Sequence, residues 1–490
     1  MKLFKTAVAL LLCSATLTSC MGIVHDTGKK YADATEIILS DSTVSVDGKK
    51  ADTDDGSAVY VSNDIVYYEK GKDFTYGEGD EGDSHSADEA AAHTVVNITK
   101  AGKYILSGTL SKGQIAVDLG KDAKDDPDSV VTLILDGANI TCTVAPAVIF
   151  YNVYECSDDS EKNATKDVDT RDAGANVIIA DSSVNNISGA YVARIYKPDS
   201  VKLNEDGNSV EDAKKLHKYD AAFYSKMSMN IFGEKENTGV LNINAENEGL
   251  DSELHLTING GIINIVSGND GINTNCDNVS VTTINDGALT ITVNGKTGEG
   301  DGIDSNGWLV INGGSVKAFA CSFSADSGID SDKGIHINGG TVLATGNMLD
   351  RIENGGQTHS VFGARITGGT SLTLRDAEGN VNDEFTLPND CSIILYSSAN
   401  LSEDSTLWNG DARLEKGNGG IGFPGGRPGG MHPEGFGKGE RPEPPEGARL
   451  PEDFDFGEKV FPHHEDGSFI KDHMAPPSHV NTEKAIFPEI

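Results

Sequence analysis

The chain has 490 residues, with 39 lysines and arginines against 76 aspartates and glutamates, so its formal net charge is −37. Such a deficit of cations argues against binding to nucleic acids or to anionic lipid surfaces, because both need positive side chains. Glycine accounts for 57 residues and aromatic residues for only 6% of the chain. This composition favours an acidic, glycine-rich β protein outside the cytoplasm.

The N-terminus predicts secretion. A basic start, Met1 to Lys5, precedes an apolar run and the sequence Leu-Thr-Ser-Cys that ends at Cys20. This arrangement resembles a bacterial lipoprotein signal, so residues 1–19 are predicted to be removed and Cys20 to carry the lipid. The protein would then be anchored to the outer face of the bacterial membrane. An ordinary signal peptide with an incidental cysteine is the alternative, and no later stretch has the ~18 apolar residues of a membrane span.

After a linker over residues 20–35, a repeated pattern dominates residues 36–412. The turn phrases are Asn259-Gly260-Gly261, Asn285-Asp286-Gly287, Asn312-Gly313-Gly314 and Asn338-Gly339-Gly340. Runs of alternating apolar and polar residues flank each phrase, which is the pattern of strands with one buried face. A period near 26 residues with short strands and glycine corners predicts a parallel β-helix, a solenoid of stacked coils. The asparagines at 259, 312 and 338 are expected to stack as a structural ladder.

The charged segments 157–172 and 197–219 interrupt the period and are predicted to be surface loops. From residue 413 to the end the chain is predicted to be a disordered Gly/Pro-rich tail, since 11 of the 15 prolines lie between Pro424 and Pro488 and such composition cannot form a packed core. Cys142 and Cys156 could pair across adjacent coils, or they could be small apolar side chains pointing inward.

A second phrase in the repeats is acidic. It recurs as Gly-Leu-Asp-Ser at 249–252, Gly-Ile-Asn-Thr at 271–274, and Gly-Ile-Asp-Ser at 302–305 and 328–331. The Leu or Ile should point into the core, and the Asp should lie directly above its equivalent in the next coil. Two carboxylates about 5 Å apart repel by roughly 3 kcal/mol at an effective dielectric of 20.

Calcium would relieve that repulsion, because it takes 6–8 oxygen ligands from carboxylates, amides, hydroxyls and carbonyls. The sequence therefore predicts Ca²⁺ sites among the acids and amides of this column. The candidate ligands are Glu248, Asp251, Asp270, Asn273, Asp301, Asp304, Asp326 and Asp330. The alternative is that Asp-Gly is simply favourable turn chemistry. Trp308 follows one acidic corner and could flank a sugar or fill the core.

These phrases, together with the segment 101–110 and the sequence Ser-Ser-Ala-Asn-Leu at 397–401, resemble a bacterial family of secreted carbohydrate-binding proteins. The likeness covers most of residues 95–405. It implies a right-handed parallel β-helix akin to pectate lyases, with bound calcium. It also implies binding of plant cell-wall polymers, especially acidic pectic chains and otherwise cellulose-like glucans, without established cleavage.

The sequence thus predicts an all-β, monomeric, non-catalytic binder of polysaccharide that depends on calcium. A pectate lyase is the first alternative, but an Arg or Lys base is needed, and no arginine occurs between Arg194 and Arg351. A surface adhesin or structural spacer is the second alternative.

Overall fold

The computed structural model describes residue 31, residues 33–295 and residues 300–417. The predicted signal peptide, the lipidation of Cys20 and most of the predicted tail therefore lie outside the described residues. The described part is built almost entirely from strands. Its single α-helix, α1 (Ala87–Ala91), begins with a capping box in which the Ser86 side chain accepts from the Glu89 amide and the Glu89 carboxylate accepts from the Ser86 amide. Two short 3-10 turns cover Ala123–Asp125 and Pro198–Ser200.

The strands form two large sheets and three small ones. The 17-stranded sheet contains β1 (Ala34–Leu39), β2 (Ser45–Val46), β3 (Lys49–Lys50), β6 (Gly102–Leu110), β8 (Val131–Cys142), β10 (Ala175–Ile179), β11 (Val184–Gly189), β17 (Met229–Gly233), β18 (Val240–Ala245), β20 (His255–Ser267), β22 (Val281–Val293), β24 (Trp308–Ile311), β25 (Ser315–Phe319), β26 (Gly334–Ile337), β27 (Thr341–Gly346), β28 (His359–Ile366) and β31 (Cys391–Ser397). The 8-stranded sheet contains β4 (Val59–Ser62), β5 (Thr94–Ile98), β7 (Gly113–Asp118), β9 (Val148–Asn152), β16 (Ala221–Ser225), β19 (Glu248–Ser252), β21 (Ile272–Thr274) and β23 (Ile303–Ser305).

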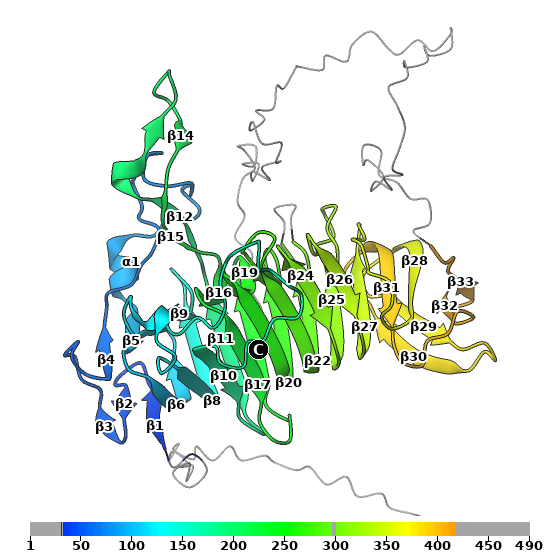
Figure 1. The fold of residues 1–490 in the computed structure, drawn as a ribbon, viewed down its shortest axis with the longest axis horizontal. Helices are drawn as coiled ribbons and strands as arrows, with labels where there is room; N and C mark the ends of the chain where they lie inside the picture. The colour runs from blue at the N-terminus through cyan, green and yellow to red at the C-terminus, as the bar shows by residue number, and fades with distance from the viewer. Residues whose placement is uncertain (1–30, 32, 296–299, 418–490) are drawn as a thin grey trace, which may run out of the picture.

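The small sheets are β12 (Val192–Tyr196) with β15 (Lys215–Tyr219), β13 (Lys202–Leu203) with β14 (Val210–Asp212), and an antiparallel sheet of β29 (Ser371–Arg375), β30 (Val381–Thr386), β32 (Thr406–Asn409) and β33 (Ala412–Arg413). Strands β12 to β15 rise away from the main body (Figure 1). The segment 197–219, predicted as a loop, therefore contains the β13–β14 pairing and also β15, which pairs with β12 just before the segment.

The predicted single right-handed parallel β-helix over residues 36–412 is wrong. Within the 17-stranded sheet, β8, β10, β17, β20, β18 and β11 pair in that order, all parallel, and β11 pairs back to β8, so six strands close a barrel-like ring. The ring closes because β8 and β20 are long strands that pair with two ring neighbours each. The first part of β8 pairs with β10 and its last part with β11. The first part of β20 pairs with β17 and its last part with β18. The Asn-Gly-Gly phrase at 259–261 was read as a strand end, yet β20 continues through it with a register shift.

Both ends of the chain also depart from a uniform solenoid. At the start, β1, β2 and β3 pair antiparallel, as do β4 and β5. At the other end, β31 pairs antiparallel with both β27 and β28. The antiparallel sheet that contains β29 and β30 follows (Figure 1).

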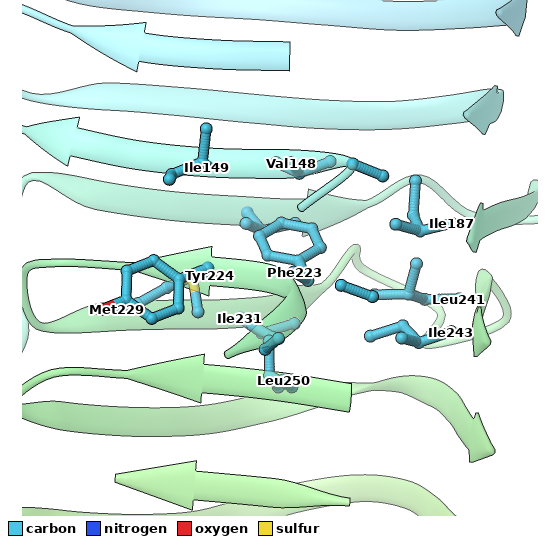
Figure 2. Packing of buried hydrophobic residues seen from close by; sticks show 14 of the residues in the cluster. Val148, Ile149, Ile187, Phe223, Tyr224, Met229, Ile231, Leu241, Ile243 and Leu250 are labelled. Atoms are coloured by element: carbon cyan, nitrogen blue, oxygen red, sulfur yellow. The ribbon is translucent and has the colours of Figure 1, made fainter. Parts of the chain in front are cut away.

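Alternation of apolar and polar residues builds the interior between the two large sheets. In β18, Leu241, Ile243 and Ala245 are buried while the residues between them face outward. Figure 2 shows Leu241 and Ile243 together with Phe223 and Leu250, which come from the 8-stranded sheet. Each fully buried Leu or Phe stabilises the fold by about 1.5–3 kcal/mol, so this packing fixes which side chains of a strand face outward.

The predicted asparagine ladder is confirmed and includes Asn285. The Nδ2 atoms of Asn285, Asn312 and Asn338 each donate to the Oδ1 atom of the preceding asparagine at 2.8 Å, starting from Asn259. Next to it, Gly314 has a φ of +75°, and a Cβ there would lie 2.6 Å from the Gly287 carbonyl oxygen. A residue with a side chain is therefore excluded at this corner.

The described cysteines form no disulfide. Cys142, Cys321 and Cys391 are buried, while Cys156 and Cys276 are partly exposed. Of the two possibilities for Cys142, an inward-pointing apolar side chain is the one that the structure shows, since it lies in the main core cluster.

Candidate metal centre

The acidic column lies on three consecutive strands of the 8-stranded sheet. Parallel pairing of β19, β21 and β23 places Asp251, Asn273 and Asp304 side by side in register. The preceding residues of the same phrases, Leu250, Ile272 and Ile303, are fully buried in the core. Alternation then turns the acidic and amide side chains away from that core, so the repeated sequence phrase itself stacks the polar groups.

A first acidic cluster consists of Asp220, Glu248 and Asp251, each of which offers a carboxylate oxygen within 4.8 Å of the others. Glu248 is 5% exposed and Asp251 is fully buried. Asp220 precedes β16, and Ala221 of that strand pairs with Glu248. Asp251 therefore does not face solvent, because neighbouring chain covers it.

One cation lies inside this first acidic cluster. The Lys218 Nζ atom is 2.7 Å from Asp220 Oδ2. Burial by itself would lower the pKa of Lys218, but the charges of Asp220, Glu248 and Asp251 outweigh burial and raise that pKa above its usual value. Lys218 is thus held as an ammonium ion, which cannot accept a proton from a substrate.

The positive charge of Lys218 does not fully compensate the negative charges of the first cluster. Burial, reinforced by Asp220 and Asp251, raises the pKa of Glu248 well above its usual value despite Lys218. Burial and the charges of Asp220 and Glu253 do the same to the pKa of Asp251, although Asn275 Nδ2 donates to both of its oxygens at 3.0 Å. A further positive charge at this point would therefore stabilise the ionised forms.

Two oxygens here lack any donor. Glu248 Oε2 and Asn273 Oδ1 are buried and have no hydrogen-bond partner among the described residues, although Asn273 Nδ2 donates to Glu248 Oε1 at 3.3 Å. A buried acceptor without a donor costs about 1–3 kcal/mol. Carboxylate and amide oxygens are the ligands that Ca²⁺ prefers, so the residues present fit a calcium ion.

A second acidic cluster consists of Asp301, Asp304 and Asp330, again with oxygens within 4.8 Å of one another. Asp301 Oδ1 accepts from the Ser327 amide at 2.6 Å, and its own amide donates to Asp270 Oδ1 at 2.7 Å. Burial raises the pKa of Asp301 well above its usual value, and the charges of Asp270, Asp330 and Asp304 add to the effect. The pKa of Asp270 is raised as well, by burial first and then by Glu248 and Asp304.

The other predicted site residues have different surroundings. Asp326 lies outside both clusters, and its Oδ2 accepts from the Gly300 amide and the Ser324 hydroxyl. Trp308 begins β24, where it pairs with Val281 and Gly334 and is partly exposed. It belongs to none of the core clusters of the described residues.

Sequence reasoning missed Asp220 and Lys218. Lys218 lies within the charged segment 197–219 and Asp220 directly follows it; the Gly-Ile-Asp-Ser phrase is absent there, so the repeat offered no reason to align them with the column. The available signal was the buried run Ala221–Ser225 directly after Asp220, which forms the strand beside β19.

Comparison with known proteins identifies the family. The family model described as carbohydrate-binding domain-containing protein matches residues 92–173 and 161–387, which together are more than half of the chain. The chain belongs to this family. A carbohydrate-binding domain-containing protein from Acetivibrio thermocellus is 29% identical over 171 residues, covering 35% of this chain and 44% of that relative, so the match spans less than half of the relative's length.

Among solved structures, the gadolinium derivative of the polysaccharide lyase-like protein from C. thermocellum is similar to this chain, with 21% sequence identity. The likeness has a TM-score of 0.36 and covers 62% of this chain and 96% of that one. Within the residues described for this chain, no helix combines the length and the apolar character that crossing a bilayer requires.

Proposed function

We propose that the protein binds cell-wall polysaccharide, acidic pectic polymers above all, through calcium ions held by the two acidic clusters. The observation that carries the proposal is the buried, donorless pair Glu248 Oε2 and Asn273 Oδ1 beside three carboxylates. Membership of the carbohydrate-binding family supports the ligand class. The predicted lipid on Cys20 would hold the protein at the outer face of the bacterial membrane.

Charge explains why a metal would serve this purpose. A protein with a net charge of −37 repels a polyuronate, so cations must lie between the two sets of carboxylates. Calcium takes 6–8 oxygens, whereas each cluster offers three carboxylates. At the second cluster, where Asp301 and Asp304 are partly exposed, the remaining coordination positions are available to uronate and hydroxyl oxygens of the polymer.

The test is calorimetric titration of oligogalacturonate into residues 21–490, first with calcium and then with excess chelator. We expect binding heat with calcium only, and no ultraviolet absorbance from unsaturated products. Asp251→Asn and Asp304→Asn should weaken binding, whereas Asp55→Asn, an exposed carboxylate outside the clusters, should not. Equal heats with and without chelator would refute the calcium requirement.

A further inference from the structure

A groove lies where the connection after β25 meets the ends of three antiparallel strands. It has a volume of about 410 Å³ and is lined by Ser322, Phe323, Ser324, Asn347, Arg365, Ile366, Thr367, Asp390, Cys391 and Ser392. Ile366 ends β28 and pairs with Cys391 at the start of β31. Asn347 directly follows β27, the other neighbour of β31. Antiparallel pairing therefore brings the ends of β27 and β28 and the start of β31 to one edge of the sheet.

Two groups in this groove are placed for ligand binding. Phe323 is 75% exposed, the most exposed of the large hydrophobic side chains in the described residues. Arg365 is also exposed, and its guanidinium has neither a hydrogen bond nor an ion pair within the part of the chain that the structure describes. An exposed ring offers a stacking face, and an unpaired guanidinium offers a fork of donors that matches a carboxylate.

The loops that carry these groups are fixed by hydrogen bonds. Asn347 Nδ2 donates to the carbonyl oxygens of Ser322 at 3.2 Å and Ser324 at 2.8 Å, on either side of Phe323. Next to the lining residue Asp390, Asn389 Nδ2 donates to the carbonyl oxygens of Val293 at 2.7 Å and Ala320 at 2.8 Å. A groove whose walls are already ordered loses less conformational entropy when a ligand binds.

We propose that this groove is a subsite for an acidic sugar unit, in which Phe323 stacks on the sugar ring and Arg365 pairs with its carboxylate. The proposal rests on the proposed function and specifies a second contact with the same polymer. The groove and the second acidic cluster share one connection, since Phe323 and Asp330 both lie between β25 and β26. Neighbouring units of one chain can thus meet a calcium ion at the cluster and the guanidinium in the groove.

Arg365 suits the acidic sugar unit because a guanidinium binds a carboxylate directly, without a metal ion. The remaining lining residues are mostly hydroxyl and amide side chains, which suit the hydroxyl groups of a sugar. Asp390 is partly engaged, because its Oδ1 accepts from the Gly368 amide at 2.7 Å. A fully neutral sugar would gain from Phe323 but leave the charge of Arg365 unused.

The test compares oligogalacturonate with its fully methyl-esterified form, each titrated into residues 21–490 with calcium and with chelator. Arg365→Ala should weaken binding of the free acid about ten-fold or more, because a charge-assisted pair is lost, and should change binding of the ester less than about two-fold. Phe323→Ala should weaken both ligands by a similar factor. Arg413→Ala and Phe74→Ala, which remove an exposed guanidinium and an exposed ring elsewhere, are the matched controls.

The arms separate this inference from the calcium proposal. If chelator leaves the affinity unchanged but Arg365→Ala still discriminates between acid and ester, the groove is supported and the calcium requirement fails. If calcium-dependent binding is intact in both groove variants, the groove proposal is overturned and the calcium proposal stands. Absence of binding of either ligand in both conditions overturns both.

Discussion

Lys218 is the residue that distinguishes the first acidic cluster from a simple set of carboxylates. Its ammonium group pairs with Asp220 at 2.7 Å and compensates part of the negative charge of Glu248 and Asp251. Without that ammonium, three buried carboxylates would face one another. The Lys218 side chain is 32% exposed, so removing it should cost less than the ~3–5 kcal/mol that is typical of breaking a fully buried ion pair.

We therefore predict that Lys218→Met lowers the melting temperature in chelator and enlarges the rise that calcium produces. The calcium ion would then be the only cation in the first cluster. Melting curves of the variant and of the parent chain, each with calcium and with chelator, provide the measurement. Lys235→Met, which removes an exposed lysine paired only with the adjacent Glu236, serves as the control. A calcium-induced rise equal in variant and parent would contradict the role given to Lys218.

A second prediction concerns His255, a buried residue of β20. Its Nδ1 accepts from the Val281 amide at 3.1 Å, so the proton is assigned to Nε2, which faces the Ser157 hydroxyl at 3.2 Å. Burial lowers the pKa of His255 from 6.5 to about 4. The unfolded chain therefore binds more protons than the folded chain between these two pH values, and stability must fall as the pH falls through that window.

The contribution of neutral His255 is complete above about pH 6.5 and amounts to roughly 3 kcal/mol, lost by about pH 4. We expect His255→Gln to be less stable than the parent at pH 7 but to lose less stability on acidification. Denaturant unfolding at pH 7 and pH 4.5 measures both slopes, with His359→Gln, at an exposed position, as the control. Parallel pH dependence in the variant and parent would show that His255 does not titrate in this way.

At the scale of elements, the asparagine ladder ties consecutive repeats together. Asn285 donates to Asn259 and accepts from Asn312, whereas Asn338 only donates, to Asn312. Each such hydrogen bond contributes about 0.5–1.5 kcal/mol. We predict that Asn285→Ala lowers the free energy of unfolding by about twice as much as Asn338→Ala, as measured by denaturant unfolding. Equal losses at the two positions would mean that the ladder bonds do not govern this stability.

The elements also show what the sequence could and could not predict. The alternating residues in β18 and β22 and the Asn phrases correctly predicted parallel strands in register with a ladder, because both signals are local and repeat at a fixed spacing. The single solenoid was wrong because closure of the ring depends on β8 and β20 running through their bends, which a glycine phrase does not reveal. The antiparallel pairing of β31 with β27 and β28 joins segments that share no repeat.

The same limit applies to the candidate site. Asp251, Asn273 and Asp304 were predicted to stack because they occupy the same position in a recurring phrase, and the strands do pair them. Asp220 joins them through an insertion that breaks the period, and the groove around Phe323 combines loops far apart in the chain. Their grouping is a property of tertiary structure, so only the structure reveals it.

At the scale of the whole molecule, the net charge of −37 opposes folding because it concentrates carboxylates that the unfolded chain keeps apart. Salt screens that repulsion, with a Debye length of about 10 Å at 0.1 M, and calcium bound at the two clusters would neutralise its most buried part. Because salt screens exposed charges far more than buried ones, we predict that sodium chloride raises the melting temperature by similar amounts in chelator and with saturating calcium, whereas calcium adds a rise that salt does not reproduce. Melting curves from low to high salt in both conditions measure the two slopes, with tetramethylammonium chloride to separate screening from binding of sodium. If high salt in chelator reproduces the whole rise that calcium gives, the dominant repulsion lies on the exposed surface and not in the clusters, and calcium there would contribute little to stability.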